Sequence, residues 1–162
     1  MLSQGLQHAI AAGDSVALTE PSTWLWVSWL ILVSSGLQCA SISPYSPIAY
    51  QYATSLKVES LMLMDKATEP YPTHQAEVAA LVTKIDIAYE YAKGRPKNEI
   101  SARQWEILKD PSGHLLGGFL RRWKDASQLS QPFVTEAKGL VADAFDTIIG
   151  VESGKVTAAG VQ

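Results

Sequence analysis

The chain has 162 residues, of which 47% are hydrophobic and 18% charged, with a net charge of −3 and a single cysteine, Cys39. This length fits one domain with an attached segment, and the composition excludes a chain that is disordered throughout. The slightly acidic balance argues against a nucleic-acid partner, and one cysteine excludes a disulfide framework.

Charged residues are unevenly distributed along the chain. Before Lys57 the only charges are Asp14 and Glu20, and residues 21–56 contain none, whereas the remaining 106 residues hold 27. A long uncharged segment cannot be solvated on most of its sides, so it requires protein or lipid around it. We therefore divide the chain into an N-terminal head (1–22), an uncharged hydrophobic segment (23–56), a helical bundle (57–150) and a C-terminal tail (151–162).

The run TWLWVSWLILV at residues 23–33 is the densest apolar stretch. As a helix, residues 23–42 match the roughly 30 Å hydrocarbon core of a bilayer, which indicates a single membrane span. The strongly apolar part is shorter, as in a helix buried in protein, and a buried strand has a similar composition. In either helical form this segment is an assembly surface, because it is apolar on every side. The expected interface residues are Trp24, Trp26, Trp29, Leu30, Ile31 and Val33.

The charges flanking this segment predict its orientation if it spans a membrane. The head has two acidic and no basic residues, which is also unlike a cleaved signal peptide, and Lys57 and Lys66 follow the segment. The positive-inside rule then places the N-terminus outside and the bundle on the cytoplasmic or matrix side. The expected location is therefore a membrane with the N-terminus out or, in the alternative without a span, the inside of a virion.

After the prolines at 44 and 47, apolar residues recur at helical spacing, which predicts a mainly α protein. Expected boundary signals are Thr73 as an N-cap, Ser101 with Gln104 as a capping box, and Gly150 as a helix end. We expect Gly117 and Gly118 to permit close approach of a neighbouring backbone. The predicted helices, packed as an irregular bundle, are 50–66, 74–93, 101–109, 115–126 and 132–149.

The apolar faces of these helices also predict the core. We expect Met62 and Met64 to fill space in it, and a fragment from residue 70 onward to fold without the preceding segment. The core residues expected to be at least three-quarters buried are Leu81, Ile85, Trp105, Leu120, Val141 and Phe145.

No catalytic, cofactor-binding or metal-binding motif survives inspection. His8, His74 and His114 are far apart in the sequence, and none has a second ligand at helical zinc-site spacing. The stretch GVESGKVT at 150–157 lacks the glycine spacing and the Ser or Thr of a phosphate-binding loop. We therefore predict a protein that is not an enzyme and that needs no cofactor or metal.

The stretch AALVTKIDIAYEYAKGRP, residues 79–96, resembles the helix and basic turn of phage head-to-tail adaptor proteins, which are small helical ring-forming subunits. The tryptophan-rich segment departs from that family. Together these features predict an accessory subunit of a large assembly, held by its hydrophobic segment in a membrane or subunit interface. The alternative is a soluble virion protein that forms a homo-oligomer. The expected partners are other subunits or copies of the chain, with lipid in the membrane case.

Overall fold

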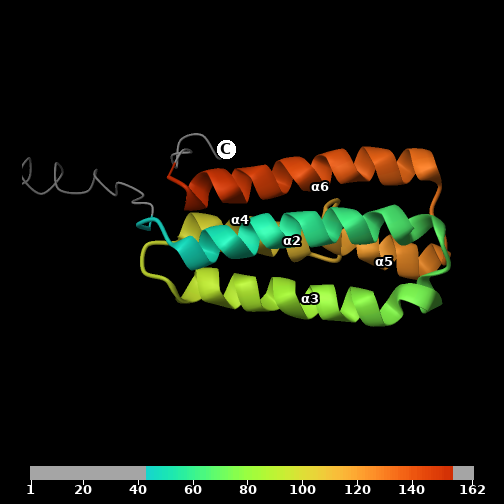
Figure 1. Ribbon diagram of the computed structural model, residues 1–162, viewed down its shortest axis with the longest axis horizontal. Coiled ribbons are helices and arrows are strands. Elements are labelled where there is room, and N and C mark those ends of the chain that lie inside the picture. Colours follow the sequence, from blue (N-terminus) through green and yellow to red (C-terminus); the bar gives the residue numbers. More distant parts are fainter. Residues whose placement is uncertain (1–42, 155–162) are drawn as a thin grey trace, which may run out of the picture. The chain divides into compact units, whose positions relative to one another are not determined.

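The computed structural model describes residues 43–154, which form a mainly α bundle (Figure 1). This confirms the predicted fold class for that part of the chain, whereas the hydrophobic helix expected near residues 23–42 lies outside the described residues. The elements are α2 (Pro47–Asp65), the short 3-10 helix η1 (Lys66–Thr68), α3 (Tyr71–Gly94), α4 (Glu99–Lys109), α5 (Leu116–Ala126) and α6 (Gln131–Glu152).

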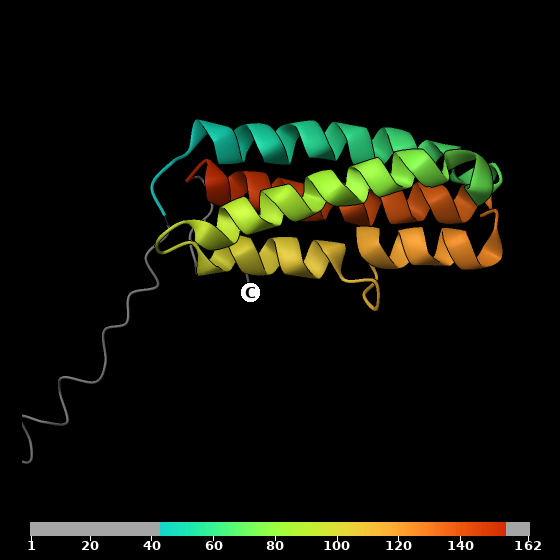
Figure 2. The same ribbon diagram turned by 90° about the horizontal axis from the view of Figure 1, so that it is seen from below.

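The helices form four antiparallel columns. α2 packs against α3 and α6, and α4 packs against the same two helices from the other side of the core. α4 and α5 follow one another end to end, so that together they make the third column (Figure 2). The bundle therefore has up-down-up-down topology, with one column interrupted between residues 110 and 115.

Two glycines make this interruption compact. A Cβ atom on Gly117 would lie 2.2 Å from the carbonyl oxygen of Lys109, and one on Gly118 would lie 1.9 Å from that of Gly113. Both distances are far below van der Waals contact, so any larger residue would push α5 away from the end of α4. The close backbone approach predicted for this glycine pair is confirmed.

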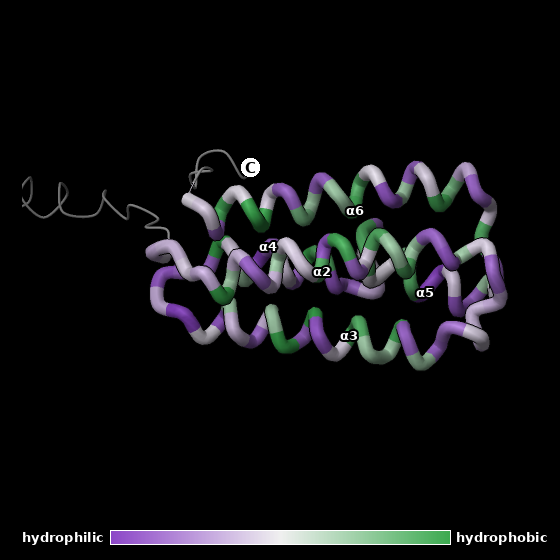
Figure 3. Tube along the Cα trace, viewed as in Figure 1, coloured by the Kyte–Doolittle hydropathy of each residue, from purple (hydrophilic) through white to green (hydrophobic). Residues whose placement is uncertain are grey.

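Each helix turns apolar residues toward the centre, while the outward positions are mostly polar, with some exposed apolar side chains (Figure 3). The six predicted core side chains have exposed fractions between 0% and 7%, so that prediction is confirmed. The core also contains Leu56, Leu63 and Met64 from α2. Because α2 is a full column, a fragment from residue 70 would expose the core side chains that α2 covers, and we now expect such a fragment to be unstable. Met62 is 65% exposed, so it is not a core residue.

Three predicted helix boundaries are wrong. α3 begins at Tyr71, because Pro70 and Pro72 suit a helix start, and Thr73 lies inside it. α4 begins at Glu99 after Asn98, so Ser101 is a buried helical residue and caps nothing. α6 passes through Gly150 to Glu152, since Val151 and Glu152 are buried, and this packing outweighs the cost of about 1 kcal/mol for a helical glycine.

No helix within residues 43–154 is both long enough and apolar enough to cross a bilayer.

Candidate functional site

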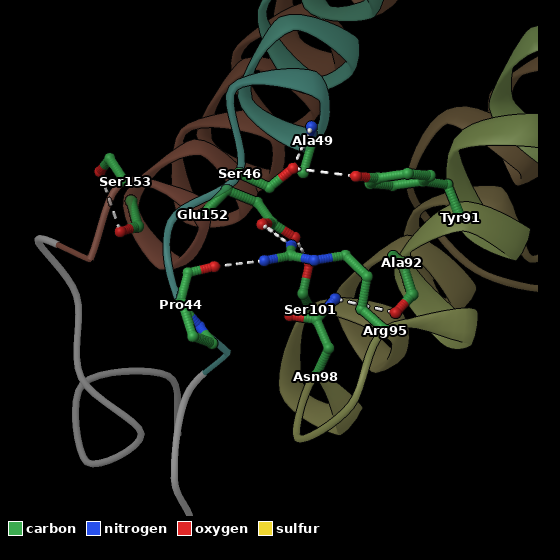
Figure 4. A network of polar contacts seen from close by, with 11 residues as sticks. Pro44, Ser46, Ala49, Tyr91, Ala92, Arg95, Asn98, Ser101, Glu152 and Ser153 are labelled. Carbon is green, nitrogen blue, oxygen red and sulfur yellow. Dashed lines mark hydrogen bonds and ion pairs between the residues drawn. The ribbon is translucent and has the colours of Figure 1, made fainter.

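The six predicted interface residues, Trp24 to Val33, lie outside the described residues. Residues 43–46 directly precede α2. A network of largely buried polar side chains holds them in place (Figure 4). This network lies at the end of the bundle where α3 and α6 end and where α2 and α4 begin. It binds residues Pro44 and Ser46, which directly precede α2.

Arg95 and Glu152 are the centre of this network. Arg95 follows the last residue of α3, and its Nη1 lies 2.5 Å from Oε2 of Glu152, the last residue of α6. The side chains are 13% and 2% exposed, so both charges are largely removed from water. The other terminal nitrogen of Arg95 donates to the carbonyl oxygen of Pro44. One guanidinium therefore joins α3, α6 and the entering chain.

Two residues of the α4 start complete the polar core of the site. The Ser101 hydroxyl donates to Oε1 of Glu152, so both carboxylate oxygens have a partner. Asn98 is 4% exposed, and its Nδ2 donates to the carbonyl oxygen of Ala92 at 2.9 Å, in the last turn of α3. These bonds satisfy polar groups that would otherwise be buried without partners.

A second contact holds the first residues of α2. Oγ of Ser46 accepts the backbone N–H of Ala49 at 3.3 Å, which is a standard N-cap of α2. The same hydroxyl lies 3.0 Å from the Tyr91 hydroxyl of α3, and the Tyr91 ring packs edge-on against Tyr52. The segment directly before α2 is thus bound at Pro44 by Arg95 and at Ser46 by Tyr91.

The polar lock, which we define as Pro44, Ser46, Tyr91, Arg95, Ser101 and Glu152, contains no arrangement for nucleophilic or acid–base catalysis. Its one carboxylate is paired on both oxygens, and its hydroxyls are within hydrogen-bond distance of other groups of the cluster (Figure 4). The sequence analysis missed it, because no local pattern links Arg95 to Glu152. A signal was present in Glu152, since an acid at the end of a strongly apolar helix requires a partner.

A second polar cluster surrounds His74 at the opposite end of α3. His74 is 7% exposed, with Nε2 lying 2.7 Å from Glu69 and Nδ1 lying 3.2 Å from Glu77. Hydrogen bonds to Glu69 and then Glu77 raise the pKa of His74 above its ordinary value of 6.5. Hydrogen bonds from Lys66 and then His74 lower the pKa of Glu77. The ring also lies beside Trp123, with centroids 5.7 Å apart, so the cluster ties α3 to α5.

A surface groove with a volume of about 790 Å³ lies between α5 and α6. The guanidinium of Arg122 lies 4.4 Å from the centre of the Phe133 ring, which stacks on Phe119. Acidic Asp125 and Glu136 line the same groove, so it has no single sign of charge. This arrangement packs the helices together and does not by itself indicate a ligand.

The histidines considered in the sequence analysis do not form a metal site within the described residues. His74 binds carboxylates through both ring nitrogens, and His114 lines the α5–α6 groove. His8 and Cys39 lie outside the described residues. Among residues 43–154, no group of three or more potential ligands could hold a metal ion.

Comparison with known proteins finds no matching family model, no similar curated protein and no similar solved structure. Residues 79–96 form the later part of α3 and the turn after it.

Proposed function

We propose that this protein is a non-enzymatic accessory subunit of a larger assembly, in which the uncharged segment before residue 43 binds lipid or other subunits and the bundle acts as a folded anchor domain. The observation that carries the proposal is the pairing of two unlike parts. A charge-free stretch that includes three tryptophans precedes a bundle whose core is filled by its own helices.

The centre of the bundle is filled by large side chains of its own helices. Trp105, Trp123 and Phe145 are at most 2% exposed, and they fill the centre between the columns. Trp105 and Phe145 pack edge to face with centroids 5.9 Å apart, a favourable aromatic geometry. The bundle core is thus formed by the described helices themselves, and we assign the uncharged segment to contacts with lipid or a partner.

The polar lock supports an anchoring role. It binds Pro44 and Ser46, directly before α2, through Arg95 and Tyr91 at the end of α3, and Arg95 is in turn paired with Glu152 of α6. A buried, multiply bonded ion pair specifies geometry more than it adds stability. In this proposal, the polar lock fixes the start of α2, so that the bundle keeps a defined orientation next to the segment that binds a membrane or a partner.

Charging the centre of the apolar segment tests this function. Leu30→Asp should release the full-length protein from membranes that are washed with carbonate, or from its assembly, while its helical circular dichroism is retained. A charge at the centre of a membrane helix costs about 2.5 to 3.5 kcal/mol on insertion scales, and a buried interface rejects it as well. Leu140→Asp, at a half-exposed bundle position, is the matched control and should change neither property.

The soluble alternative is a virion protein that forms a homo-oligomer. The observation that favours it is the apolar outer surface of α2, where Ile48, Val58 and Met62 are all more than half exposed. Under this alternative the wild-type protein forms oligomers of one size in buffer without detergent. Membrane pelleting of the wild type, with no oligomer in detergent-free buffer, would contradict the alternative and support the membrane version.

A further inference from the structure

The outer surface of α2 carries a continuous row of exposed residues without any charge. Ile48, Gln51, Ser55, Val58 and Met62 follow one another at intervals of three and four residues, and all five are exposed. We call this row the α2 stripe. This spacing keeps the residues in line along one side of a helix, as in the contact seam between two packed helices.

The apolar residues of the stripe have large exposed fractions. Ile48 is 52% exposed, Val58 57% and Met62 65%. Ile87 of α3 is 50% exposed, and it lines a groove with Ile48 and Ser55 that has a volume of about 480 Å³. The apolar surface therefore extends sideways from α2 onto α3.

Charged residues flank the stripe on both sides, and they are paired within the bundle. Two ion pairs connect α2 to α6 on one side of the stripe. Two more connect α2 and η1 to α3 on the other side. The pairs are Lys57–Asp146 at 2.6 Å, Asp65–Lys138 at 2.5 Å, Glu59–Lys84 at 2.6 Å and Lys66–Glu77 at 2.5 Å. An uncharged centre with a polar rim is the usual composition of a protein–protein interface.

We propose that the α2 stripe is a two-fold interface, in which a second copy of this chain packs its own α2 stripe in the antiparallel direction. The stripe is self-complementary about Ser55, because Ile48 and Met62 are each seven residues from it. A two-fold axis at Ser55 places Ile48 against Met62 of the partner subunit, and the small serine allows the helices to approach closely. An isologous contact of this kind closes as a dimer.

The available surface is sufficient for such a dimer. From Ile48 to Asp65 the helix is about 27 Å long at 1.5 Å per residue, and two helices at the usual spacing span about 18 Å. The face of α2 and α3, with the charged rim on the α3 side included, then covers about 500 Å² per copy, or about 1,000 Å² in total, which is the lower limit for a specific interface. We therefore expect a weak dimer that forms reversibly.

This inference does not depend on the uncharged N-terminal segment. The proposed function assigns residues 23–33 to lipid or other subunits, whereas the stripe lies wholly on the described bundle. Leu30→Asp should release the protein from its membrane or assembly and leave pairing through the stripe unchanged. Failure of one proposal is thus visible without failure of the other.

Disulfide cross-linking of the full-length protein in mild detergent tests the geometry. Cys39 is the only cysteine, so the Cys39→Ser protein provides a thiol-free background. In it, Ser55→Cys should form a covalent dimer at least about tenfold faster than Thr135→Cys, an exposed control position on α6, because pairing raises the local thiol concentration. Equal rates for the two variants would overturn the proposal.

A mixture of two variants tests the direction of the helices. Ile48→Cys mixed with Met62→Cys should give a cross-linked heterodimer, while each variant alone gives little product. Efficient cross-linking of each variant with itself would indicate parallel helices and would overturn the proposal.

A charged residue placed in the stripe provides a second measurement. Val58→Lys should slow cross-linking through Ser55→Cys at least about tenfold, because it puts two like charges into the centre of the contact. Leu140→Lys, which adds the same charge at a half-exposed position of α6, should leave the rate unchanged. Because both positions are exposed, circular dichroism should be the same for both variants. An unchanged rate in Val58→Lys would contradict the proposed interface.

Discussion

The ion pair between Arg95 and Glu152 offers the sharpest test of how the bundle holds the entering chain. Replacing Arg95 with Met removes the guanidinium and keeps a side chain of similar length. Glu152, with a side chain that is 2% exposed, then keeps only the Ser101 hydroxyl as a partner. The carbonyl oxygen of Pro44 also loses the hydrogen bond that Arg95 donates to it.

The expected loss of stability follows from this burial. Removing one partner of a buried ion pair costs about 3 to 5 kcal/mol, because an uncompensated charge stays in the interior. The reverse change, Glu152→Leu, should cost less. Arg95 is 13% exposed and retains the Pro44 carbonyl oxygen, so its guanidinium can reach water and still has one acceptor. We expect about 1 to 3 kcal/mol for Glu152→Leu, the usual range for a lost polar partner.

The double variant separates charge from packing. Arg95→Met combined with Glu152→Leu removes both charges, and apolar replacement of a buried ion pair is often neutral or stabilising. The double variant should therefore be at least about 2 kcal/mol more stable than Arg95→Met alone, since it no longer buries an unpaired carboxylate. Urea unfolding of the full-length protein in mild detergent, followed by circular dichroism, gives all four free energies of unfolding.

Two results would refute this reasoning. If Arg95→Met costs less than about 1 kcal/mol, the value typical of a surface ion pair, the pair is solvated and locks nothing. If the two single changes add in the double variant, the side chains do not act as a pair.

Three further predictions concern the core, the histidine cluster and the break between α4 and α5. Phe145→Ala should lower the free energy of unfolding by about 3 to 5 kcal/mol, because Phe145 is fully buried. Leu140→Ala should lower it by less than about 1 kcal/mol, because Leu140 is 50% exposed. Equal costs of the two variants in urea unfolding would contradict this prediction. The raised pKa of His74 implies stabilisation that is complete below its ordinary pKa of 6.5 and is lost as pH rises through the folded-state pKa. Unfolding measured from pH 5 to 9 should show this loss in the wild type and not in His74→Gln. Gly118→Ala should destabilise the bundle by roughly 1 to 3 kcal/mol, since its Cβ would lie 1.9 Å from a carbonyl oxygen, while Gly139→Ala, which has open space, should be neutral or stabilising in thermal unfolding.

Helical periodicity was sufficient to predict the bundle and much of its core. Residues such as Val141 and Phe145 repeat at intervals that place them on one helix face, and a face of that kind is buried in almost any bundle. Helix ends were harder to predict, because several side chains compete to cap each one. Ser101 matches a capping pattern, but the structure uses its hydroxyl to bind Glu152 from α6.

The role of α2 could not be derived from the sequence alone. Its charge-free first half continues the uncharged segment, so composition groups residues 23–56 together, whereas the structure begins α2 at Pro47 and makes it a column of the bundle. Composition reports which residues avoid water, but only the fold shows which neighbours exclude it. Met62 and Met64 illustrate this limit, since they are two residues apart and are 65% and 0% exposed.

The sequence by itself determined that this protein is mainly α in its charged part and that an uncharged, tryptophan-rich segment precedes that part. Both features are local, since they depend on residue type and spacing within one stretch of chain. Only the tertiary structure decided that Arg95 and Glu152 meet and that the α2 stripe faces solvent. Arg95 and Glu152 are 57 positions apart in the sequence, and the exposure of α2 depends on which helices cover it. Both are determined by the packing of all the columns, and no local sequence pattern specifies such packing.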